Sequence, residues 1–182
     1  MKFTNAEKLI VTMLADLHEK LGIDEVRTKL IKQAIYSNNT WALSWELTGI
    51  VGDSPEQTLP EVSLVVDILH MWSVIEAAYE RFDATEKSAF EAIADPLRKR
   101  VAFSGFDGNN ETEYMGIANF LVKEMNRFTQ FADRDLNSHC PVIVGYQRML
   151  EKFLPIRPKL ADRGLSAEEM ADVLNAQRYS TF

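Results

Sequence analysis

The chain has 182 residues, of which 46% are hydrophobic and 26% charged, and its formal net charge is −7. This length fits one ordinary domain, residues 1–182, and the apolar fraction is sufficient for a core without disulfides or metals. An acidic chain lacks the positive surface that binds phosphate backbones, so a nucleic-acid partner is not expected. The single cysteine, Cys140, cannot form an intrachain disulfide, which suits a reducing compartment.

The N-terminal residues run directly into a capped helix and lack the apolar stretch of a secretory signal. No segment approaches about 18 consecutive apolar residues, so no membrane-spanning segment is expected. Together with the single cysteine, these features predict a cytoplasmic protein that does not act at a membrane.

Helix-start signals recur along the chain. At four places a capping residue is followed three positions later by an acid, which is the spacing of a capping box. These pairs are Thr4 with Glu7, Thr58 with Glu61, Asn110 with Glu113, and Ser166 with Glu169. So many helix starts in one chain are difficult to reconcile with a sheet protein.

The first predicted helix follows Thr4. Its large apolar residues fall within an arc of about 140° when each residue turns the chain by 100°. They are Leu9, Ile10, Met13, Leu14, Leu17 and Leu21. Gly22 then stands where a left-handed C-terminal cap is expected. Two shorter helices are predicted next, at about 25–37 and 41–50.

The longest predicted helix covers about residues 59–82, and its apolar side chains sweep an arc of about 220°. A helix that is apolar over more than half of its circumference is surrounded by neighbours. Further helices are predicted at about 85–94, 110–130 and 141–153, and a last one opens at Ser166. The pattern therefore predicts an all-α fold, a compact irregular bundle of about seven to eight helices around the central one.

Gly116 lies inside the helix predicted at 110–130, where glycine costs about 1 kcal/mol relative to alanine. Its neighbours on the helix surface, Asn119, Lys123 and Arg127, are polar. Close approach of another backbone, within the fold or across a subunit interface, is one explanation. A tolerated glycine is the other.

Turn, cap and aromatic positions over nearly the whole chain match the pattern of one family. They are Thr4 to Ile10, Gly105 to Asp107, Glu113 to Gly116, Arg127 to Phe131, Tyr146 to Leu150, and Leu165 to Ala167 through Asn175 and Ala176. In these segments the chain resembles the YfbU family, more loosely over residues 22–94, while the loop 132–138 departs from the pattern. The resemblance implies a compact all-helical fold in a bacterial cytoplasmic protein. It implies no particular biochemical activity and supplies no catalytic residue.

The central helix carries the main candidates for catalysis. Glu76 and Glu80 fall one turn apart inside its apolar arc, so a desolvated pair there would serve as a proton relay or as metal ligands. Pairing with an arginine, or contact with solvent, is the alternative. His70 follows Asp67 by three residues, a spacing that fits a surface pair or an oriented general base. No recognisable catalytic motif is present, and no metal site or cofactor is predicted.

Trp41 and Trp45 lie one turn apart on a short predicted helix. Core packing is the first interpretation, and an aromatic anchor for a protein partner is the second. The broad apolar arcs favour a homo-oligomer, because a small monomer does not always cover so much apolar surface. The sequence therefore favours a homo-oligomeric interaction or regulatory protein. The alternative is an unfamiliar, metal-assisted enzyme that uses Asp67, His70 and the two glutamates.

Overall fold

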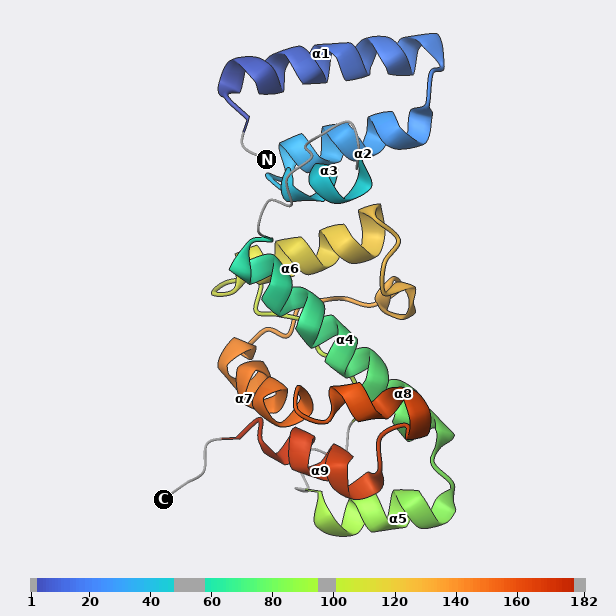
Figure 1. Cartoon of the computed structure of the whole chain (residues 1–182). Coiled ribbons are helices and arrows are strands. Elements are labelled where there is room, and N and C mark those ends of the chain that lie inside the picture. Colours follow the sequence, from blue (N-terminus) through green and yellow to red (C-terminus); the bar gives the residue numbers. More distant parts are fainter. Residues whose placement is uncertain (1–2, 48–57, 95–100, 179–182) are drawn as a thin grey trace.

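The long helix α4, Pro60–Arg81, runs through the middle of the molecule in the computed structural model, which describes residues 3–47, 58–94 and 101–178 (Figure 1). Its buried residues occupy an arc of about 200° when each residue turns the helix by 100°. They are Val62, Val65, Ile68, Leu69, Met71, Trp72, Ile75, Glu76 and Ala78. The predicted central helix is therefore confirmed.

The other helices are stacked along one direction, and the body is elongated (Figure 1). One end is formed by α1 (Asn5–Leu21), α2 (Glu25–Tyr36) and α3 (Trp41–Glu46), and α6 (Thr112–Asn119) lies beside α4. The opposite end holds the remaining helices: α5 (Ala84–Ile93), α7 (Ile143–Phe153), α8 (Leu160–Arg163) and α9 (Ala167–Asn175). The described residues contain no β-strand, only an isolated bridge between Phe106 and Asn137, so the all-α prediction is confirmed.

Two of the predicted capping boxes are present, because Thr4 with Glu7 and Ser166 with Glu169 exchange both hydrogen bonds. Gly22 ends α1 in the left-handed conformation, with φ 66°, as expected. Asp83 with Glu86 forms a further box at the start of α5, which the sequence analysis did not identify.

The other two capping-box predictions were wrong. α4 begins at Pro60, whose fixed φ suits the first helical position, and its N-cap is Leu59, which makes no side-chain capping bond. At the start of α6 the N-cap is Glu111, and it makes no side-chain cap either. Instead, the Asn110 amide donates to the Asp107 carboxylate at 2.5 Å.

The helix predicted at 110–130 is shorter than expected. α6 ends at Asn119 and continues as a π-helical turn over Phe120–Glu124. Asn126 and Phe128 then adopt positive φ values of 52° and 53°, which no α-helix tolerates. The early break carries the chain into the short 3₁₀ turn Thr129–Phe131, where Phe131 is buried.

By length and composition alone, α4 is the one described helix that could cross a membrane. A core helix passes the same test, and nearly half of its most apolar window, 44%, is buried inside the molecule. The property is therefore explained by its central position.

Candidate functional site

Glu76 and Glu80 of α4 do not form a carboxylate pair. Glu76 is buried and accepts from both terminal nitrogens of Arg134, each at 2.7 Å. It also accepts from the backbone N–H of Phe103 at 2.6 Å. Glu80, one turn further on, is exposed. Glu76 therefore has the arginine partner that was the alternative in the sequence analysis, and it ties α4 to two distant segments.

Asp67 and His70 share Arg157 as a neighbour. The Asp67 carboxylate accepts from Arg157 at 2.8 Å. Burial lowers the pKa of His70, and the nearby Arg157 cation lowers it further, against the opposing effect of Asp67. The His70 Nδ1 atom is buried and has no hydrogen-bond partner among the described residues. Over residues 3–47, 58–94 and 101–178, no group of three or more His, Cys, Asp or Glu side chains is placed to hold a metal ion.

Trp41 and Trp45 pack edge to face, with ring centroids 5.1 Å apart. Trp41 is only 7% exposed, and its indole N–H donates to Asn39 at 2.9 Å, so it belongs to the core. Trp45 is half-buried, and the Arg127 guanidinium lies 5.3 Å from its ring centre. Whether either ring contacts a partner remains a prediction, and only Trp45 presents part of its surface to solvent.

The most unusual surface belongs to α1. All the large apolar residues of its 140° arc are more than half exposed, at 52% to 69%. They are Leu9, Ile10, Met13, Leu14, Leu17 and Leu21, and we call them the α1 face. The apolar stripe of a surface helix normally packs on the core, so this exposure is opposite to the usual arrangement.

The reason lies in how α1 meets α2, the element against which it mainly packs. The contact uses the opposite side of α1, where Ala15 is its only buried described residue. Lys32 of α2 holds the two helices together through ion pairs with Asp16 and Glu19, both at 2.8 Å. α1 is thus fixed with its apolar stripe turned outward, at the end of the molecule (Figure 1).

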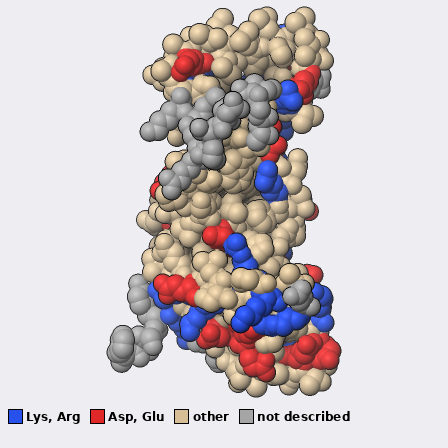
Figure 2. Space-filling view, viewed as in Figure 1, with Lys and Arg blue, Asp and Glu red and all other residues tan. Residues whose placement is uncertain are grey.

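One charged residue, Lys20, falls within the 140° arc of the α1 face, in the last turn of the helix. Figure 2 shows few charged atoms over the end that holds α1, whereas Lys, Arg, Asp and Glu are mixed at the end that holds α5, α8 and α9. The sequence analysis found the arc of α1, but periodicity says nothing about which neighbour covers it.

The structure thus defines a class: an all-helical protein that has a large, uncovered apolar helix face. The YfbU domain model matches residues 1–176, nearly the whole chain. The chain is also 31% identical over 136 residues to a UPF0304 protein of Methanocaldococcus jannaschii, a match that covers 72% of this chain and 75% of that one. This chain belongs to the YfbU family, as its turn and cap residues indicated.

Proposed function

We propose that this protein is a self-associating interaction protein, in which two copies pair through the α1 face. The observation that carries the proposal is the exposure of six large apolar side chains on one side of α1. Scattered exposed apolar residues are normal on a protein surface, but a contiguous patch of this kind marks a contact with another molecule.

The area of the face fits a second copy. Six side chains exposed by 52% to 69% present an apolar surface on the order of 600 Å², as large as the largest patch on a typical monomer. Two such faces would remove roughly 1,200 Å² from water, which reaches the lower limit of specific protein interfaces. Val26, which is 85% exposed on the adjacent α2, extends the same end of the molecule.

Hydrogen-bonding groups at the edge of the α1 face also suit a second copy. Glu7 and His18 are separated by eleven residues, or three turns of helix, so they lie on the same edge of α1. In an antiparallel pair of identical helices, a two-fold axis brings each edge against the same edge of the other copy. Glu7 of one copy then meets His18 of the other, with Met13 near the axis. The contact is self-complementary.

The experiment is to measure molar mass by light scattering over a range of protein concentrations. Wild-type protein is expected at twice the chain mass of 20.7 kDa, and Leu17→Glu at the single-chain mass. Leu17 is 57% exposed, so this change should leave helix content and folding intact. Val144→Glu is the matched control, because Val144 is also about half exposed, at 50%, but lies on α7.

The control variant should retain the wild-type mass. A single-chain mass for wild type at every concentration would overturn the proposal, as would a Leu17→Glu variant that still pairs.

A further inference from the structure

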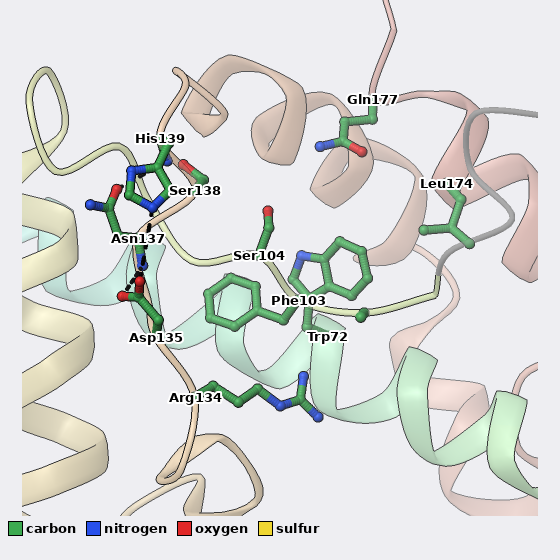
Figure 3. A pocket seen from close by; sticks show the side chains of 11 residues that line it. Trp72, Phe103, Ser104, Arg134, Asp135, Asn137, Ser138, His139, Leu174 and Gln177 are labelled. Carbon is green, nitrogen blue, oxygen red and sulfur yellow. Dashed lines mark hydrogen bonds and ion pairs between the residues drawn. The ribbon is translucent and has the colours of Figure 1, made fainter.

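A cavity of about 760 Å³ lies between α4, the segment that follows residue 101, and the loop 134–139, with the end of α9 beside it (Figure 3). This volume falls within the range of small-molecule sites. Two of its walls are aromatic, Trp72 and Phe103, and both are almost fully buried. The cavity is far from α1 in the fold, so its occupation by a ligand is independent of pairing through the α1 face.

One buried polar atom of a residue that lines this cavity lacks the hydrogen bond that such an atom normally makes. Trp72 is 3% exposed, and its indole Nε1–H has no hydrogen-bond partner among the described residues. An indole nitrogen is a donor only, and a buried donor without an acceptor is unfavourable and rare. Figure 3 shows the indole nitrogen on the side of the ring that faces Ser104, another residue that lines the cavity.

The polar groups around the cavity are held in place by the protein itself. The Ser104 hydroxyl is 2.9 Å from the Tyr146 hydroxyl, which also donates to the Gly105 carbonyl at 3.2 Å. At the other side, Arg134 is fixed by its two bonds to Glu76.

The mouth carries one further polar pair. The His139 Nε2 atom lies 3.9 Å from the Asp135 carboxylate, and both side chains are largely exposed. The side-chain amide of Gln177 points toward Ser104 from the end of α9 (Figure 3). The walls are therefore arranged before any ligand arrives, which lowers the ordering cost of binding.

We propose that this cavity binds a small organic molecule, which places a carbonyl or carboxylate oxygen against the Trp72 N–H and a flat apolar part against Phe103. The oxygen satisfies the unpaired donor, and the aromatic walls accept the apolar part. Gln177, which both donates and accepts, and Ser104, which accepts because its proton is used on Tyr146, orient the polar end. No local pattern in the sequence indicates this binding site, because its residues come from four separate segments.

The test is a titration followed by nitrogen–proton NMR of the three tryptophan indole groups. The probes are benzoate and benzamide, which carry an oxygen acceptor, and benzylammonium, which has the same ring but no acceptor. For compounds of this size, dissociation constants of roughly millimolar are expected. Benzoate or benzamide should shift the Trp72 Nε1–H signal downfield and saturate, and the two compounds distinguish a carboxylate from a neutral carbonyl ligand.

Ala102→Leu provides the blocking variant, since Ala102 lines the cavity and a larger side chain fills it. This variant should keep the Trp72 signal and weaken the probe response at least tenfold. Ala89→Leu, at an exposed position of α5, is the matched control and should respond like wild type. The proposal is overturned if neither acceptor probe moves the Trp72 signal, if benzylammonium moves it equally, or if Ala102→Leu responds as wild type does. In each case, water would be the hydrogen-bond acceptor for the indole N–H.

Discussion

Glu76 and Arg134 are 58 residues apart in the chain and meet in a two-pronged ion pair, with both nitrogen–oxygen distances at 2.7 Å. The same carboxylate accepts from the Phe103 N–H. One side chain of the central helix thus fixes both the loop that follows Phe131 and the segment that carries Phe103. Both segments line the cavity around Trp72.

Removing this carboxylate should therefore be costly. Glu76→Ala leaves a backbone N–H and a partly buried guanidinium without their acceptor. We expect a loss of about 2 to 3 kcal/mol in the free energy of unfolding, below the value for a fully buried pair because the Arg134 side chain is 35% exposed. Urea unfolding measures it. Glu80→Ala, at an exposed position of the same helix, should change stability by no more than about 0.5 kcal/mol; equal losses would contradict this role.

Glu111 caps a helix that is remote in the chain. Its Oε1 accepts from the N–H groups of Val142 and Ile143, both at 2.8 Å, at the start of α7. Its Oε2 accepts from the Asp107 N–H at 2.9 Å. Glu111→Gln turns one acceptor into a donor and removes charge from a helix N-terminus, so unfolding should become easier by about 1 to 3 kcal/mol. The exposed Glu113→Gln is the control in the same denaturation assay, and a comparable loss there would argue against the cap.

Two glycines should respond in opposite directions to alanine. Gly116 is exposed on α6, and a Cβ built there meets nothing within 4 Å, so the fold itself makes no close backbone approach at this position. Gly116→Ala should stabilise the protein by up to about 1 kcal/mol. Gly105 has φ +87°, and a Cβ would overlap the Leu136 carbonyl, so Gly105→Ala should cost about 2 to 4 kcal/mol. Thermal unfolding shows whether each variant is more or less stable than wild type. A destabilised Gly116→Ala would point instead to a contact between subunits.

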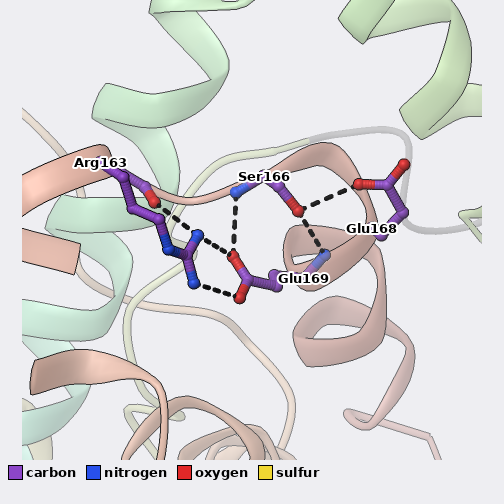
Figure 4. Close-up of polar contacts among 5 residues, drawn as sticks. Arg163, Ser166, Glu168 and Glu169 are labelled. Carbon is purple, nitrogen blue, oxygen red and sulfur yellow. Dashed lines mark hydrogen bonds and ion pairs between the residues drawn. The ribbon is translucent and has the colours of Figure 1, made fainter. Parts of the chain in front are cut away.

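The start of α9 should show a pH-dependent contribution to stability. The two hydrogen bonds from Arg163 lower the pKa of Glu169 from its ordinary 4.5, and the Ser166 N–H adds to this (Figure 4). The folded state therefore binds this proton less readily than the unfolded state. The stabilisation is complete above pH 4.5 and is lost as the pH falls through the lower folded value.

The measurement is urea unfolding of wild type and Glu169→Gln between about pH 3 and 7. The difference in free energy of unfolding should be largest near neutral pH and should shrink toward pH 3. Arg163→Gln removes the main cause of the shift and should flatten the profile. A difference that stays constant with pH would count against the ion pair.

Local signals were sufficient wherever a structure is decided within a few residues. Thr4 with Glu7, Gly22, and Ser166 with Glu169 were identified correctly because each cap is completed within one helical turn. The central helix was identified from its broad apolar arc, since no other arrangement buries such a segment. The capping boxes predicted for Thr58 with Glu61 and for Asn110 with Glu113 are absent. α4 begins at Pro60 instead, and the N-cap of α6 is Glu111.

The sequence by itself determined that the chain is helical, where most helices begin, and that α4 is central, because hydrogen bonding and apolar period are local properties. The tertiary structure decided which side of α1 is covered, which partner Glu76 finds, and that Trp72 lines a cavity with its N–H unpaired. These depend on contacts between residues tens of positions apart, and spacing along one helix carries no information about them. The same stripe from Leu9 to Leu21 is compatible with a buried or an exposed helix, and only the way α2 packs against Ala15 turned it outward.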